Sequence, residues 1–278
     1  MQWTPPPAVE GQARWEGGRR RTFGLLLLAL PMLLFLVLPL VALMARVRLE
    51  SLIENLGGSP VVQAISLSLT TTAVSTSAAL IFGTPLAYLL ARRTFPGRAL
   101  IDTLIDLPMV LPPSVAGIAL LIAFGRRGLI GAYLTDLGLN IAFTQIAVVL
   151  AQIFIAAPFY IKAAIAGFAG VERDLEQAAA IDGASGWRIF RYITVPLAWP
   201  VLFGGAVMTW ARALGEFGAT IIFAGNFPGR TQTMPLAIYI GFELDLNVAL
   251  TLSVILLVTS FLVLFVVKGV LRQRVNGM

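Results

Sequence analysis

The chain has 278 residues, of which 58% are hydrophobic and only 12% are charged. Soluble domains contain about 45–50% apolar and about 25% charged residues, so a soluble fold could not bury this much apolar surface. The net charge of +6 comes from basic residues that lie in short clusters between apolar runs. This pattern is typical of membrane proteins and argues against nucleic-acid binding. The composition therefore predicts an integral membrane protein.

The sequence contains neither cysteine nor histidine. Without cysteine the chain cannot form disulfides, iron–sulfur clusters or thiolate zinc sites. Without histidine it lacks the usual general base and the commonest metal ligand. An intramembrane hydrolase would need two carboxylates at helical spacing deep in one span, and no span offers them. We therefore expect no catalytic residue, no bound metal and no cofactor.

The first apolar run follows a polar, proline-rich tail, residues 1–23, that ends in three arginines. The run covers residues 25–44, which matches the ~20 residues that a helix needs to cross a bilayer. A secretory signal has a shorter apolar core of about 7–15 residues and a small-residue cleavage site. We therefore predict an uncleaved transmembrane helix over residues 24–46.

Further along the chain, apolar segments of spanning length predict an all-α membrane protein with six transmembrane helices. The five later spans are expected at residues 60–90, 103–124, 142–166, 197–223 and 249–267. Basic residues cluster in the segments that would be cytoplasmic if the N-terminus lay inside. We therefore predict that both termini are cytoplasmic. The clusters are Arg14 with Arg19, Arg20 and Arg21; Arg92, Arg93 and Arg98; Lys162, Arg173, Arg188 and Arg191; and Lys268, Arg272 and Arg274.

The link between the fourth and fifth spans, residues 167–196, is long and would lie in the cytoplasm. Asp174 is expected to cap a short helix that contains strong helix formers. Gly183 should end that helix, and a second short helix over Trp187–Tyr192 should precede Pro196, which opens span five. Small side chains beside large ones suit docking into a groove of another protein. The alternative is a solvated amphipathic linker. The residues expected to dock are Asp174, Glu176, Gln177, Ala178, Ala179, Gly183, Ala184, Trp187, Ile193 and Pro196.

The spacing Gln177-Ala-Ala-x3-Gly183-x9-Ile193-x-Val195-Pro196 resembles the Glu-Ala-Ala loop of ABC-importer permeases. The family pattern has glutamate where Gln177 stands, although Glu176 is adjacent, and leucine where Val195 stands. The resemblance covers residues 60–270 and implies the type I importer (MetI-like) transmembrane fold. It further implies that the loop forms coupling helices.

The same resemblance implies several partners. They are two ABC ATPase subunits, a second copy of this chain, an external oxyanion-binding protein and the lipid bilayer. The sequence has no Gly-x4-Gly-Lys-Ser/Thr phosphate loop, which agrees with ATP being bound and hydrolysed by a partner.

Two stretches, residues 107–117 and 212–239, resemble molybdate permease subunits, above all the Pro-Gly-Arg-Thr-Gln-Thr segment at 228–233. Sulfate and tungstate permeases share parts of both stretches, so sulfate, thiosulfate and tungstate remain alternative solutes. A secondary carrier is a further alternative, which predicts inverted repeats or intramembrane acids suited to ion coupling.

Two groups of residues are candidates for the translocation pathway or its gate. Prolines in the third span remove backbone donors and should kink that helix beside protein or water. Arg212 and Glu216 are spaced i, i+4 within the fifth span, where charges are costly and usually pair or serve the pathway. We favour a structural pair over substrate contact. The candidates are Pro112, Pro113, Ser114, Gly117, Arg212 and Glu216.

Overall fold

The computed structural model describes residues 18–47 and 49–276, and every regular element among them is a helix. The chain divides into two compact units, Met1–Arg46 and Val47–Met278, which are treated separately. The predicted tail at 1–23 lies mostly outside the described residues. The first unit contributes α1 (Gly18–Arg46), in which Leu25–Arg46 has a mean hydropathy of 2.9 and no buried residue in its most apolar stretch. The predicted first span is therefore confirmed as a helix of spanning length.

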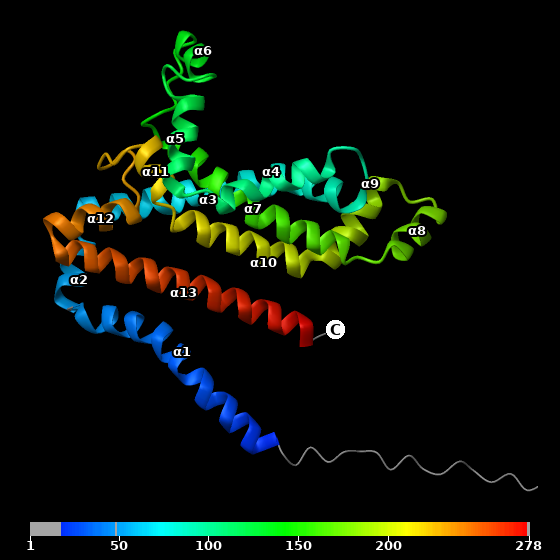
Figure 1. Ribbon diagram of the computed structural model, residues 1–278, viewed down its shortest axis with the longest axis horizontal. Helices are drawn as coiled ribbons and strands as arrows, with labels where there is room; N and C mark the ends of the chain where they lie inside the picture. Colours follow the sequence, from blue (N-terminus) through cyan, green and yellow to red (C-terminus); the bar gives the residue numbers. More distant parts are fainter. Residues whose placement is uncertain (1–17, 48, 277–278) are drawn as a thin grey trace, which may run out of the picture. The chain divides into compact units, whose positions relative to one another are not determined.

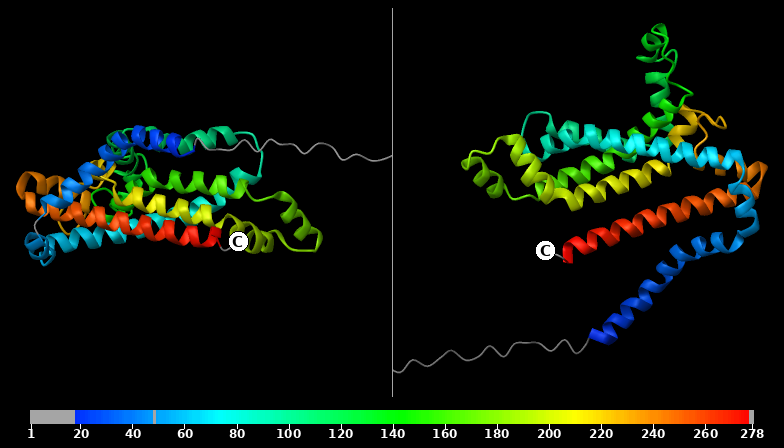
Figure 2. Two further views of the ribbon diagram at one scale, coloured as in Figure 1. Left: turned by 90° about the horizontal axis from the view of Figure 1, so that it is seen from below. Right: turned by 180° about the vertical axis from the view of Figure 1, so that it is seen from behind.

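The second unit is built around three long helices that lie side by side, α3 (Ser59–Arg92), α7 (Gln145–Ala169) and α10 (Val195–Leu214) (Figures 1 and 2). Small residues allow the close approach. A Cβ at Gly205 would meet Ala163 of α7 at 2.6 Å, and one at Gly83 would meet Tyr160 at 3.1 Å. Small residues at the contacts are how membrane helices pack without a hydrophobic driving force between them.

Three further helices flank this bundle, α2 (Leu49–Leu56), α12 (Met234–Leu244) and α13 (Leu246–Asn276), whereas α6 (Gly131–Asp136) lies away from it (Figure 1). In Figure 1, α12 lies near one end of the bundle, and the loop helices α8 (Arg173–Ile181) and α9 (Gly186–Ile189) lie near the other. The short apolar helix α12 was not predicted.

The third span is more sharply broken than a kinked helix. It consists of α4 (Arg98–Val110) and α5 (Pro113–Phe124), and the chain direction bends by 116° between them. Leu111 and Pro112 are extended between them, because the residue before a proline is disfavoured in the helical region and here Pro112 is followed by Pro113. Prediction of one kinked helix over 103–124 is therefore wrong. Among the described residues five helices are long and apolar enough to span, or six if this bent pair counts as one span.

The fifth span also differs from the prediction of 197–223. Its helix runs unbroken from Gly186 through α9, a π-helical turn η1 (Phe190–Thr194) and α10 to Leu214. It then stops, and a separate short helix, α11 (Gly218–Phe223), follows. The apolar pattern continues across this break, so hydropathy alone could not place it.

Close packing at Gly205 yields a stability prediction. Gly205→Ala should lower the thermal unfolding midpoint of the detergent-solubilised protein, since overpacking a fixed contact costs about 1–3 kcal/mol. Gly269→Ala is the matched control, because a Cβ there meets nothing within 4 Å and alanine favours helix. Equal midpoints for the two variants would contradict the packing of α10 on α7.

Candidate coupling loop and translocation elements

The loop between α7 and α10 contains the predicted helix–glycine–helix arrangement. Gly183 has φ +84°, and the chain reverses as Asp182 N–H and Ala184 N–H donate to Ala178 O and Ala179 O. This αL residue after a helix is the usual glycine terminator. The geometry of the predicted turn is confirmed, while its docking role stays a prediction.

Two local predictions in this loop are wrong. Asp174 does not cap α8, because the helix begins at Arg173 and Glu172 occupies the capping position without a side-chain hydrogen bond. Asp174 instead lies in the first turn with Glu176, where acidic side chains favour the helix dipole. The second helix does not end before Pro196 either. Since Pro196 has no N–H to donate, the π-helical turn η1 carries the helix into α10 without a break.

Glu176 anchors the loop to the bundle. Its Oε1 accepts from Arg92 Nη2 of α3 at 2.9 Å and from the hydroxyl of Thr194 in η1 at 2.5 Å. Arg92 Nη2 also donates to the carbonyl of Val171 at 3.1 Å. The side chains are only 8% (Arg92) and 16% (Glu176) exposed, so α3, α8 and η1 meet in a shielded ion pair. Sequence reasoning counted Arg92 only as an indicator of topology and missed this role.

The opposite face of α8 is open. Leu175 is 46% exposed and Ile181 is 86% exposed, and Trp187 of α9 is 67% exposed. Residues three apart share a helix face, which places Leu175, Ala178 and Ile181 in one stripe. Of the other predicted docking residues, Gln177 and Pro196 are exposed, and Ala179, Ala184 and Ile193 are half-buried. The loop therefore presents an apolar surface that this unit does not cover.

The two groups of candidate pathway residues meet in space. Helix α5 packs on α11, where a Cβ at Gly117 would collide with Ala219 and one at Gly218 would collide with Pro113. Pro112, Pro113 and Ser114 are exposed beside this contact, whereas Gly117 is buried in it. Residues predicted from stretches about a hundred positions apart therefore lie at one junction of broken helices.

Arg212 and Glu216 form an ion pair at the break between α10 and α11. Arg212 Nη1 lies 2.9 Å from Glu216 Oε2, and Glu216 Oε1 accepts from the backbone N–H of Ala219 at 2.8 Å. Glu216 is 1% exposed, so these two partners, and not solvent, stabilise its carboxylate. The predicted pairing is confirmed as a contact. It stabilises the first turn of α11, and any part in gating stays a prediction.

A further cluster of charged residues joins α4 and α7, and the contacts among its members were not predicted from the sequence. Lys162 of α7 donates to Asp102 Oδ1 at 2.8 Å and to Asp106 Oδ2 at 2.9 Å, both on α4. The sequence signal was present, because Asp102 and Asp106 are spaced i, i+4 and Lys162 is the one charge within α7. The cluster ties the first half of the broken third span to the central bundle.

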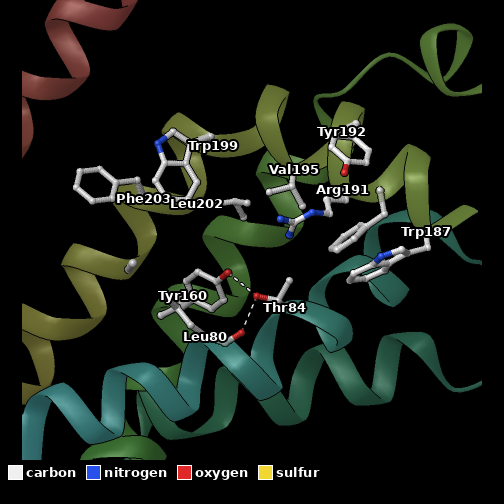
Figure 3. A pocket seen from close by; sticks show the side chains of 12 residues that line it. Leu80, Thr84, Tyr160, Trp187, Arg191, Tyr192, Val195, Trp199, Leu202 and Phe203 are labelled. Carbon is white, nitrogen blue, oxygen red and sulfur yellow. Dashed lines mark hydrogen bonds between the residues drawn. The ribbon is translucent and has the colours of Figure 1, made fainter. Parts of the chain in front are cut away.

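A cavity of about 520 Å³ lies between α3, α7 and the α9–η1–α10 helix (Figure 3). Its wall is mainly apolar and aromatic, with Trp187, Trp199 and Phe203 among the lining residues. Thr84 and Tyr160 point toward each other and share a 2.6 Å hydrogen bond, so each hydroxyl already has a partner. Arg191 is the charged residue in the wall. This cavity is too apolar to hold a desolvated dianion at low cost.

This arrangement, broken spans around a three-helix bundle with an anchored helical loop at one end, defines a class of helical membrane transport subunits. Residues 83–277 match the family described as the binding-protein-dependent transport system inner membrane component. The match covers more than half of the chain, and the chain belongs to this family. It is accordingly a multi-pass inner-membrane transport subunit and not an enzyme.

Several curated relatives are transport permeases. The chain is 41% identical to the putative molybdenum transport system permease protein YvgM of Bacillus subtilis over 73% of this chain and 91% of the relative. It is 47% identical to the molybdenum permease ModB of Escherichia coli K12, over 64% and 78%. A sulfate permease, CysW of Synechococcus elongatus, is 37% identical over 81% and 79%.

Solved structures show the same fold. A bacterial ABC transporter involved in alginate import aligns with a TM-score of 0.73 at 18% identity, over 93% of this chain and 98% of that one. The MetNI methionine ABC transporter in an inward-facing form aligns with a TM-score of 0.58 at 20% identity, over 77% and 95%. The predicted type I importer fold is confirmed.

The Glu176 anchor yields a second stability prediction. Glu176→Ala leaves the shielded guanidinium of Arg92 without its carboxylate, and should destabilise the protein by about 3 kcal/mol, as removing one partner of a buried pair does. Gln177→Ala, at the exposed neighbouring position, is the control. Thermal unfolding in detergent measures both. A Glu176→Ala midpoint equal to that of Gln177→Ala would show that the pair does not anchor α8.

Proposed function

We propose that this chain is the permease subunit of an ATP-driven molybdate importer. The assignment of molybdate as the substrate rests on sequence identity. The chain is 41–47% identical to permeases named for molybdenum and 37% identical to the sulfate permease. The importer would contain two copies of the chain, two ATPase subunits and an external binding protein that delivers the oxyanion. Both termini and residues 167–196 would face the cytoplasm, where basic residues concentrate.

In this proposal the ATPase binds the α8–α9 loop. The exposed stripe of Leu175, Ala178 and Ile181 suits a groove of a partner, as in helix-in-groove recognition. On the other side of α8, the Glu176 anchor would pass displacement of the loop to α3 and η1.

The helix that leaves the loop supplies a path to the broken spans. It is continuous from Gly186 to Leu214, 29 residues, which corresponds to roughly 43 Å. At its far end Arg212 and Glu216 connect it to α11, which packs on α5. A movement of the loop would therefore be transmitted along one rigid element to the junction of α5 and α11. That junction, with exposed Pro112, Pro113 and Ser114, is the proposed gate.

Substrate choice is tested with purified components. Proteoliposomes containing the permease, its ATPase and its binding protein should show ATP-dependent uptake of radiolabelled molybdate. A hundredfold excess of unlabelled molybdate should abolish this uptake, and tungstate should compete more strongly than sulfate. Uptake of sulfate but not molybdate would assign the chain to the sulfate class, and uptake without any ATPase would favour a secondary carrier.

The docking stripe is tested by substitution at an exposed position. Ile181→Ser should weaken retention of the ATPase in pull-down by roughly tenfold or more, since burying an isoleucine side chain contributes about 1.5–3 kcal/mol. Because Ile181 is 86% exposed, the folded state of the chain alone should be unaffected. Leu137→Ser is the matched control, at a 75% exposed leucine beside α6. Equal retention by the two variants would contradict docking through α8.

A further inference from the structure

A polar pocket of about 260 Å³ lies where the loop meets the end of α3. Its wall combines the last turn of α3, with Tyr88, Arg92 and Arg93, and one face of α8. Helix α8 contributes Arg173 and Glu176, followed on the same face by Gln177 and Ala180. Residues at these spacings share one side of a helix, and it is a different side from the Leu175–Ala178–Ile181 stripe.

This basic pocket carries uncompensated positive charge. Three guanidinium groups, of Arg92, Arg93 and Arg173, face a single carboxylate. That carboxylate, Glu176, already accepts from Arg92 and Thr194. Arg92 is only 8% exposed, and its Nε has no hydrogen-bond partner among the residues that the structure describes. Buried donors are almost always satisfied by protein or ordered water, so this Nε adds an unmatched donor to the positive charge beside the pocket.

An apolar groove of about 550 Å³ adjoins the pocket. Its wall is almost entirely apolar and includes Pro85, Leu89, Trp187 and Phe190. Tyr88 and Arg93 line both the groove and the pocket, so the two are contiguous. Leu89 is 43% exposed and Trp187 is 67% exposed, which leaves the groove open along the outside of α3. Tryptophan is enriched at the boundary between lipid and water, where one side of the ring is apolar.

We propose that the basic pocket and the groove together bind one anionic phospholipid. The phosphate head group occupies the pocket and accepts from the arginines, and an acyl chain lies along the groove toward Pro85. Arginine pairs with phosphate through parallel hydrogen bonds, and basic pockets between membrane helices on the cytoplasmic side attract anionic head groups. The proposal requires the loop to face the cytoplasm, but it requires neither an ATPase nor a particular transported solute.

Such a lipid has a definite place in the fold. It fills the angle between α3 and the anchored face of α8, beside the Arg92–Glu176 pair. The Leu175–Ala178–Ile181 stripe on the other side of α8 remains free for a protein partner. The lipid therefore supports the loop against the bundle without covering this stripe, although Gln177 and Trp187 would contact the lipid.

Head-group binding is measured by native mass spectrometry of the full-length chain. The chain is titrated with phosphatidylglycerol or with phosphatidylcholine of identical acyl chains. The unmodified chain should retain phosphatidylglycerol selectively. Arg93→Gln and Arg173→Gln should each reduce its apparent affinity about fivefold, the effect of one basic residue near a membrane surface. Arg98→Gln is the control, because it removes an exposed arginine at the nearby start of α4 that lines neither cavity. Arg92 is left intact because its ion pair holds the loop.

Acyl-chain placement is measured by fluorescence quenching. Phosphatidylglycerol with brominated acyl chains should quench tryptophan emission more than brominated phosphatidylcholine, and Trp187→Phe should remove that difference. Glycerol 3-phosphate, which offers the phosphate without a chain, should displace the lipid only weakly.

Three results would overturn the proposal. One is equal retention of both lipids by the unmodified chain, and another is equal loss of binding in Arg98→Gln. The third is unchanged lipid binding in Arg93→Gln and Arg173→Gln together with loss of the ATPase, which would make the pocket a contact for an acidic side chain of that protein.

Discussion

Within a bilayer every backbone polar group needs a partner from the chain itself, and this constraint governs where the helices of this protein can break. Each break is repaired locally. At the bend of the third span, Leu111 N–H donates back to Leu107 O, and Ala116 N–H donates to Pro112 O. At the end of α10, Gly215 N–H donates to Ala211 O, and the buried carboxylate of Glu216 accepts from Ala219 N–H. At these two breaks, therefore, proline, glycine or a buried acid supplies the geometry that the helix loses.

The same constraint connects the loop with the broken spans. Because η1 accommodates Pro196 without ending the helix, α9 and α10 form one rigid element between the anchored loop and the α5–α11 junction. Near the loop this element contacts the Arg92–Glu176 pair through the Thr194 hydroxyl, and at the break Arg212 pairs with Glu216. A pair in a shielded site costs much to separate, so we expect a displacement of either end to displace its partners as well. This is the physical basis of the coupling proposed for the protein.

Much of this could be predicted from the sequence, and the failures have physical causes. Hydropathy located the apolar segments but not the breaks within the third and fifth, and the motif around Gly183 predicted a helix–turn–helix loop whose turn the positive φ confirms. The 116° bend was underestimated, because local rules report that prolines break a helix but not the angle, which packing against α11 sets. The roles of Arg92 and Lys162 were missed since their partners lie 84 and 56–60 residues away along the chain. The i, i+4 spacing of Asp102 and Asp106 shows that two carboxylates share a face, but not which distant residue pairs with them.

The central claim is that an ATPase binds the loop at α8 and α9 on the cytoplasmic face. Because the sequence contains no cysteine, this claim can be tested directly by labelling introduced cysteines. Single cysteines are introduced by Asp182→Cys in the loop and by Asp136→Cys in α6, both at exposed positions. They are then labelled with a membrane-impermeant maleimide in inverted and in right-side-out vesicles. The account predicts that Asp182→Cys is labelled only in inverted vesicles and is protected by added ATPase, whereas Asp136→Cys is labelled only in right-side-out vesicles. Labelling of Asp182→Cys from outside, or no protection by the ATPase, would contradict it.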